Sequence, residues 1–129
     1  MTAESLYREI ILEHYRNPQN RGTLDPADFS YEDTNPLCGD EVRIDMRVND
    51  GIVSDIAFSG RGCAISQASA SMLTEMVRGQ PIEEVKKITK EDLLEELEIP
   101  LSPARLKCAL LSLKVLKAGI YGVGHDEYL

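Results

Sequence analysis

Three cysteines and one aspartate are the side chains of this sequence best suited to bind a metal. Cys38 lies in the turn Asn-Pro-Leu-Cys-Gly-Asp, directly before a clear strand pattern, and Asp40 follows two residues later. Cys63 follows Gly-Arg-Gly and precedes a helical pattern, and Cys108 lies in the second turn of a later one. Three thiolates and a carboxylate make four ligands, a set that suits tetrahedral zinc, and thiolates also hold iron–sulfur clusters.

The surroundings of two of these cysteines favour the thiolate form. Unpaired N–H groups at a helix N-terminus carry a partial positive charge that favours a thiolate at Cys63, and Arg61 adds to this effect. Arg105 lies one helical turn before Cys108, and Lys107 adjoins it. No Cys-x-x-Cys motif is present, so only the fold can bring the cysteines together. The alternative is that they are separately buried thiols. We predict one shared site formed by Cys38, Asp40, Cys63 and Cys108.

The composition is that of an ordinary globular domain. The 129 residues predict one domain, which we place at 1–120, followed by a flexible tail at 121–129. The formal charge is −8 and no basic patch is visible, so we do not expect a nucleic-acid partner. There is no apolar run near the roughly 20 residues of a membrane span and no secretory signal. We therefore expect no membrane partner and a cytoplasmic location, where the thiols stay free.

The first half of the chain predicts a helix and then strands. Apolar residues spaced by three and four predict a helix at 4–16, which Asn17-Pro18 ends. A short edge strand is expected at 28–32. Strict alternation predicts a strand at 41–48, and Asn49-Asp50-Gly51 predicts a hairpin turn into a second strand at 52–59, broken at Gly60. We expect its buried side to carry Ile52, Ile56 and Phe58.

Helical patterns fill the second half. The helix that begins at Ala64 ends before Gly79 and Pro81, and a short helix follows at 82–88. Thr89 and Asp92 form a capping box for another short helix through Leu97. The last long helix begins with Ser102 as its N-cap and Pro103 as its first residue, and runs to Gly119. The order predicts an α+β domain with helices on one face of a small antiparallel sheet. The face expected to be buried on the helix from Ala64 carries Ile65, Ala68, Met72 and Met76.

Four motifs occur in order along the chain: Glu13–Gly22 (EHYRNPQNRG), Asn35–Asp40 (NPLCGD), Gly60–Ser66 (GRGCAIS) and Pro103–Cys108 (PARLKC). Together they resemble the IscU/SufU-type iron–sulfur cluster assembly scaffold family, over about residues 5–120. The resemblance implies a SufE/IscU-like fold with a three-stranded antiparallel sheet. It implies Cys38, Asp40, Cys63 and Cys108 as the ligands of a transient [2Fe–2S] cluster or of zinc. Arg105 and Lys107 are expected beside them because of their positions next to Cys108.

The resemblance also implies a role and partners. A cysteine desulfurase, a pyridoxal-phosphate enzyme, delivers sulfur as a persulfide, and the finished cluster passes to iron–sulfur acceptor proteins. Cys108 is the expected persulfide acceptor, and Cys38 takes this role in the zinc-bearing branch. We expect a scaffold or sulfur-transfer protein rather than a stand-alone enzyme, as a monomer or weak homo-oligomer. Because a carboxylate is a harder and more labile ligand than a thiolate, Asp40 should ease cluster release.

Two features resemble different branches of the family. Lys107 stands where the scaffold branch has histidine and resembles the SufU branch, whose members bind zinc and transfer sulfur. The short connection between Cys63 and Cys108 resembles the scaffold branch instead, although that branch's chaperone-recognition stretch is not matched at 99–103. Cluster scaffold and zinc-dependent persulfide acceptor both stay open. A structural zinc module and a cysteine-nucleophile enzyme rank below them, because Asp40 is unusual in closed zinc sites and no histidine lies near a cysteine.

Overall fold

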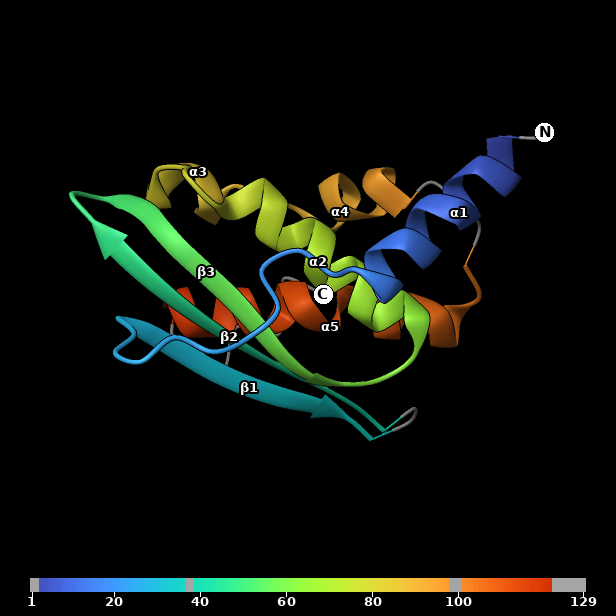
Figure 1. Cartoon of the computed structure of the whole chain (residues 1–129), viewed down its shortest axis with the longest axis horizontal. Coiled ribbons are helices and arrows are strands. Elements are labelled where there is room, and N and C mark those ends of the chain that lie inside the picture. Colours follow the sequence, from blue (N-terminus) through green and yellow to red (C-terminus); the bar gives the residue numbers. More distant parts are fainter. Residues whose placement is uncertain (1–2, 37–38, 98–100, 122–129) are drawn as a thin grey trace.

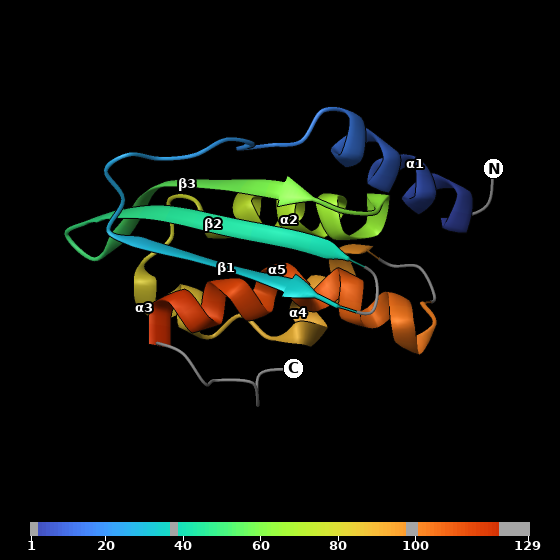
Figure 2. The ribbon, with the colours of Figure 1, turned by 90° about the horizontal axis from the view of Figure 1, so that it is seen from below.

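The computed structural model describes residues 3–36, 39–97 and 101–121, and in these ranges it contains one three-stranded sheet and five helices (Figure 1). The sheet is antiparallel in the order β1-β2-β3, and the helices lie on one of its faces (Figure 2). The predicted α+β class and the three-stranded sheet are therefore confirmed. The elements are α1 (Ala3–Arg16), β1 (Phe29–Asn35), β2 (Asp40–Asn49), β3 (Ile52–Arg61), α2 (Ala64–Val77), α3 (Ile82–Lys86), α4 (Lys90–Leu97) and α5 (Pro103–Tyr121).

The β2–β3 hairpin forms where alternation and turn chemistry predicted it. Asp50 and Gly51 both have positive φ, as this tight turn requires. One prediction about β3 was wrong: Val53 is fully buried, whereas Ile52 is 37% exposed. The register shifts between Arg47 and Val48, and such a bulge exchanges the faces of the residues beyond it. Ile56 and Phe58, on the near side of the bulge, are buried as predicted.

Two strands are longer than their sequence patterns indicated. β1 runs to Asn35, which pairs with Asp40 of β2. β3 continues through Gly60 to Arg61, which pairs with Glu41, so the strand break predicted at Gly60 was wrong by two residues. Cross-strand pairing with β2 holds both extensions in the sheet. As a result β1, β2 and β3 all reach the same end of the molecule.

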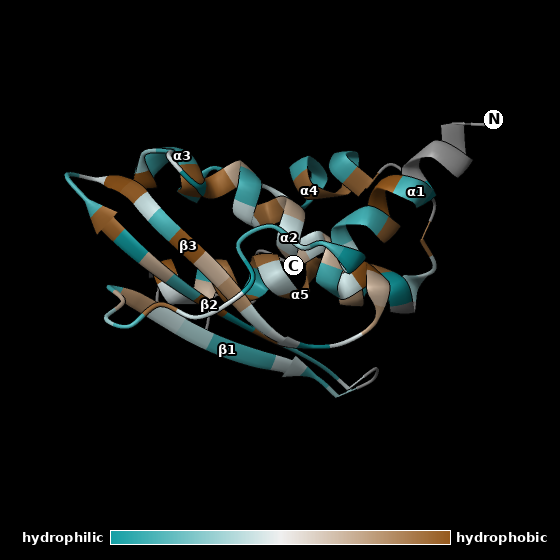
Figure 3. Ribbon diagram, viewed as in Figure 1, coloured by the Kyte–Doolittle hydropathy of each residue, from teal (hydrophilic) through white to brown (hydrophobic). Residues whose placement is uncertain are grey.

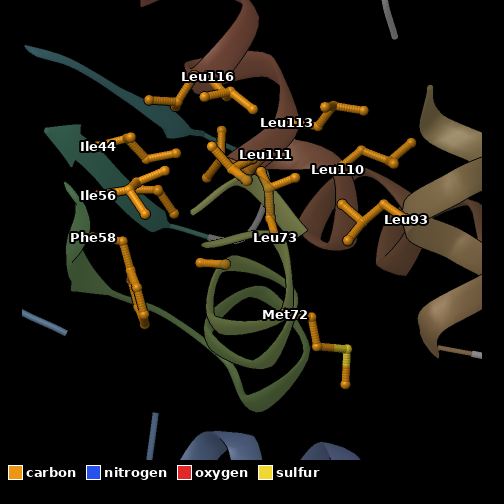
Figure 4. Packing of buried hydrophobic residues seen from close by; sticks show 14 of the residues in the cluster. Ile44, Ile56, Phe58, Met72, Leu73, Leu93, Leu110, Leu111, Leu113 and Leu116 are labelled. Carbon is orange, nitrogen blue, oxygen red and sulfur yellow. The ribbon is translucent and has the colours of Figure 1, made fainter. Parts of the chain in front are cut away.

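The core lies between the sheet and the two long helices, α2 and α5 (Figure 4). The prediction for α2 named only part of its buried surface, because Leu73 and Val77 are fully buried along with Ala68. α2 contacts α1, α4, α5 and β3, which explains why it is buried on most sides. On α5, Leu113 and Leu116 are at most 1% exposed. Figure 3 shows polar residues alternating with apolar ones along the strands, as expected for a sheet covered on one side.

The helix starts follow local capping rules. Thr89 and Asp92 form the predicted capping box, in which the Thr89 N–H donates to Asp92 Oδ2 at 2.9 Å and the Asp92 N–H to Thr89 Oγ1 at 3.2 Å. The N–H of Arg105 donates to Ser102 Oγ at 3.4 Å, so Ser102 caps α5 as predicted. None of the helices among the described residues is long and apolar enough to span a membrane.

One buried lysine ties α5 to α3. Lys117 is 2% exposed, and its Nζ donates to the carbonyl oxygen of Lys86 at 2.5 Å. Burial lowers the pKa of Lys117 below its ordinary value, and the charge of Asp92 opposes part of that effect. The lysine is thus a buried ionisable group whose protonation is coupled to folding.

Candidate metal centre

The sheet and the two long helices bring three distant segments to one end of the fold. Asp40 is the first residue of β2, and antiparallel pairing places this start of β2 beside the end of β3. Cys63 is the second of the two residues between β3 and α2 and occupies the N-cap position of α2. Cys108 lies in the second turn of α5, which begins at the same end of the molecule as α2 (Figure 1).

Asp40, Cys63 and Cys108 lie close enough to share one metal ion. A carboxylate oxygen and the two Sγ atoms all lie within 4.8 Å of one another. Two sulfur ligands at about 2.3 Å from a tetrahedral zinc lie roughly 3.8 Å apart. The distances among the three atoms of this site are therefore close to those between the ligand atoms of a bound zinc ion. Asp40 is 1% exposed, Cys108 is 4% exposed and Cys63 is half-buried. The residues present therefore fit a metal, with Cys63 on the accessible side.

The Asp40 carboxylate also contacts the backbone and the sulfur of Cys63. Its Oδ1 accepts a hydrogen bond from the backbone N–H of Cys63 at 3.0 Å, and its Oδ2 lies 3.6 Å from Cys63 Sγ. The carboxylate thus occupies the start of α2, where unpaired N–H groups favour negative charge. One oxygen holds the backbone of Cys63 in place, and the other is beside the sulfur.

Two glycines permit this close approach. A Cβ at Gly62 would lie 2.5 Å from Asp40 Oδ1 and 2.5 Å from Ser66 Oγ. A Cβ at Gly60, where φ is +125°, would lie 2.1 Å from the carbonyl oxygen of Glu41. The space beside these glycines is filled by Asp40, Ser66 and the backbone of β2 rather than left open for a ligand. Only the tertiary contacts reveal this role of the two glycines.

The remaining predicted site residues divide into two groups. Cys38 lies outside the described residues, so its participation stays a prediction. The cationic residues lie at the surface: Arg61 is 81% exposed and its Nη2 lies 3.5 Å from Glu41 Oε1, while Arg105 and Lys107 are exposed on α5. Ser66 was not predicted as part of the site. Its Oγ donates to the carbonyl oxygen of Cys63 at 3.1 Å and so supports the turn that carries the cysteine.

His14 packs between α1 and α2. Its Nδ1 lies 2.7 Å from Ser71 Oγ, and its Nε2 lies 3.5 Å from Glu75 Oε1, so it joins α1 to α2. Its partner Ser71 lies on α2 eight residues after Cys63, which is about two helical turns. Histidine therefore does not complete the ligand set among the described residues.

Comparison with known proteins identifies the class of this fold and site. The sequence matches the NifU-like N terminal domain family over residues 6–125. The chain belongs to this family, which confirms the relationship that the four motifs predicted.

Named relatives cover nearly the whole chain. The zinc-dependent sulfurtransferase SufU of Bacillus subtilis is 38% identical, over 91% of this chain and 90% of its own. The iron–sulfur cluster assembly scaffold protein IscU of Escherichia coli K12 is 37% identical, over 88% of this chain and 91% of its own. The crystal structure of SufU from Fervidobacterium islandicum superposes with a TM-score of 0.79 at 26% identity, covering 92% of this chain and 99% of that one.

Proposed function

We propose that this protein is an iron–sulfur cluster assembly scaffold that accepts sulfur from a cysteine desulfurase, assembles a [2Fe–2S] cluster and passes it to acceptor proteins. The observation that carries the proposal is the meeting of Asp40, Cys63 and Cys108 from three distant segments, within 4.8 Å of one another. Relatives named as a scaffold or as a sulfurtransferase, which match over about nine tenths of both chains, support it. We include Cys38 as the fourth ligand.

The geometry suits a site that must exchange its contents. Thiolates bind iron and zinc firmly, whereas a carboxylate is a weaker ligand for these metals. Cys63 is half-buried and lies at a helix start, so an incoming partner can reach it without opening the core. The other two groups are held by rigid elements, Asp40 by β2 and Cys108 by α5. A scaffold needs this combination of fixed ligands and an accessible side.

The sulfur-transfer step requires one of the cysteines as acceptor. A thiolate of this protein attacks the outer sulfur of the desulfurase persulfide, a new S–S bond forms, and the desulfurase cysteine leaves as a thiolate. We propose Cys108 as the acceptor, with Arg105 and Lys107 as cationic neighbours that favour its thiolate form. Because Cys108 is 4% exposed, this assignment requires that its surroundings open when the desulfurase binds.

A second candidate function is that of a zinc-dependent sulfur carrier. Lys107 and the similarity to SufU favour it, and zinc held by the same ligands would stabilise their thiolate forms. However, this chain is 37% identical to E. coli IscU, almost the same identity as to SufU. The short connection between Cys63 and Cys108 favours the scaffold. The predicted cytoplasmic location and the monomeric or weakly associated state stay predictions.

An anaerobic assembly reaction distinguishes the two functions. The protein is mixed with a cysteine desulfurase, cysteine, ferrous iron and a reductant, and the visible absorption and the rate of cysteine turnover are recorded. Visible absorption typical of a [2Fe–2S] cluster supports the scaffold. Faster turnover without a stable cluster supports the sulfur carrier, and no response in either measurement rules out both.

Single cysteine variants then locate the persulfide. Cys108→Ser should abolish persulfide labelling after reaction with the desulfurase in the absence of iron, whereas Cys63→Ser should retain it. Labelling that survives in Cys108→Ser and disappears in Cys38→Ser would move the acceptor to Cys38. The circular dichroism of each variant serves as the control for folding.

A further inference from the structure

A groove beside the metal centre stands out because of its charge. It has a volume of about 800 Å³ and runs along one side of α5, between the end of β1 and α4. The chain as a whole carries 22 acidic and 14 basic residues. The groove reverses this balance, because the part of its lining that the structure describes contains three lysines and no acidic residue. The lining residues are Thr34, Asn35, Pro36, Lys90, Leu94, Pro103, Leu106, Lys107, Leu110, Leu111 and Lys114.

The floor of the groove is apolar and follows a helical repeat. Leu106 and Leu110 are four residues apart on α5, and Leu94 lies one turn beyond Lys90 on α4. Leu94 and Leu106 are only half-buried, so they present apolar surface to an occupant. The stretch of α5 from Pro103 to Lys114 spans about 16 Å, which is three helical turns. This length fits a short helix of another protein better than a compact small molecule.

The lysines lie on both sides of this floor. Lys107 and Lys114 are seven residues apart and so share one face of α5, while Lys90 lies at the start of α4. Lys114 also pairs with Asp33 of β1 at 3.3 Å, which holds it at the groove wall. An occupant with an apolar stripe and carboxylates on either flank would match both the floor and the walls.

We propose that this groove docks an acidic amphipathic helix of a protein partner that exchanges sulfur or a cluster with the site, a role that rests on the function proposed above. The groove adjoins the metal centre at two points, because Lys107 precedes Cys108 and Asn35 pairs with Asp40. A helix bound here lies next to Cys108. It holds the rest of the partner over the end of the fold where the candidate ligands meet.

A defined peptide tests the docking without any cluster chemistry. The probe is a synthetic 16-residue helix with leucine at positions spaced by three and four and glutamate on both flanks of that stripe. Two control peptides carry a scrambled order or lysine in place of glutamate. We expect the acidic amphipathic peptide alone to bind metal-free protein, to shift NMR signals of Leu94, Leu106 and Leu110, and to bind more weakly as salt is raised.

A matched pair of protein variants tests the charge. Lys90→Glu should weaken peptide binding by about tenfold, since one close charge pair is reversed. Lys87→Glu is the control, because Lys87 is 72% exposed and does not line the groove. Equal binding by Lys90→Glu, equal binding of the lysine peptide, or NMR shifts centred on α1 or the open sheet face would overturn the proposal.

Two further outcomes separate this proposal from its alternatives. If dodecanoate shifts the groove signals and no peptide does, the groove binds small amphipathic anions and the partner proposal is wrong. If the peptide binds as expected but the assembly reaction yields neither a cluster nor faster turnover, the docking surface stands and the proposed function fails. If a cluster assembles but the peptide does not bind, the proposed function stands and the docking proposal is wrong.

Discussion

Gly62→Ala tests whether the position of Asp40 organises the metal centre. The added Cβ would lie 2.5 Å from Asp40 Oδ1, whereas ordinary contact begins at 3.4 Å, so the carboxylate must move by about 0.9 Å. Asp40 is 1% exposed and cannot simply swing into solvent. The movement breaks its 3.0 Å hydrogen bond from the N–H of Cys63.

The expected size of the effect follows from that bond. A hydrogen bond to a charged group contributes about 1.5–3 kcal/mol, so the free energy of unfolding of Gly62→Ala should fall by roughly that amount. Each 1.4 kcal/mol is about tenfold in affinity, so displacement of Asp40 and Cys63 should weaken zinc binding by at least about tenfold. Urea denaturation measures the stability, and competition with a chromophoric chelator measures the zinc affinity.

Gly119→Ala is the matched control for this substitution. Gly119 lies within α5, and among the described residues its added Cβ would meet only Tyr31 Cβ at 3.5 Å, an ordinary contact. Alanine should therefore stabilise the helix by about 0.5–1 kcal/mol without changing zinc affinity. If Gly62→Ala binds zinc within twofold of wild type and unfolds at the same urea concentration, Asp40 does not organise the site as we describe.

Three further predictions concern the ligands and the buried lysine. Asp40→Ala should slow the loss of an assembled cluster, measured by the decay of its visible absorption, because the most labile ligand is gone. Asp40→Asn is the control, because it keeps an oxygen for the Cys63 N–H and so shows how much of the change is structural. Faster cluster loss in Asp40→Ala would contradict the prediction. Iodoacetamide should modify half-buried Cys63 faster than Cys108, which is 4% exposed, and added zinc should protect both; peptide mass mapping reads this out. Burial lowers the pKa of Lys117 below its ordinary value of 10.5 in the folded protein. Just below pH 10.5 the unfolded chain therefore binds more protons than the folded one. The free energy of unfolding should rise with pH there, by at most about 1.4 kcal/mol per pH unit from this residue. Lys117→Met should abolish that rise in urea denaturation measured between about pH 8 and pH 10, whereas Lys87→Met, at a 72%-exposed lysine, should not.

Much of the fold follows from local patterns that the sequence contains in full. Alternation over 41–48 predicted β2, because side chains of a strand point to opposite faces in turn. Thr89 with Asp92 predicted the start of α4, because a capping box involves only residues three apart. The motifs around the cysteines predicted the family, and the match over residues 6–125 confirms it.

Features that depend on contacts between distant segments needed the tertiary structure. The bulge at Arg47 and Val48 decided that Val53 rather than Ile52 is buried, since the alternation cannot show where pairing shifts. The distance between Cys63 and Cys108 likewise depends on how α2 and α5 pack, because the two cysteines are 45 positions apart along the chain.

The sequence by itself therefore determined which residues could act as ligands and which elements carry them, because ligand chemistry and local periodicity are properties of short segments. The tertiary structure alone decided that Asp40, Cys63 and Cys108 meet within 4.8 Å, that Gly62 makes room for the Asp40 carboxylate, and that three lysines gather beside an apolar floor. The physical reason is that sheet register and helix packing, which bring distant residues together, result from the burial of the whole core rather than from any one segment.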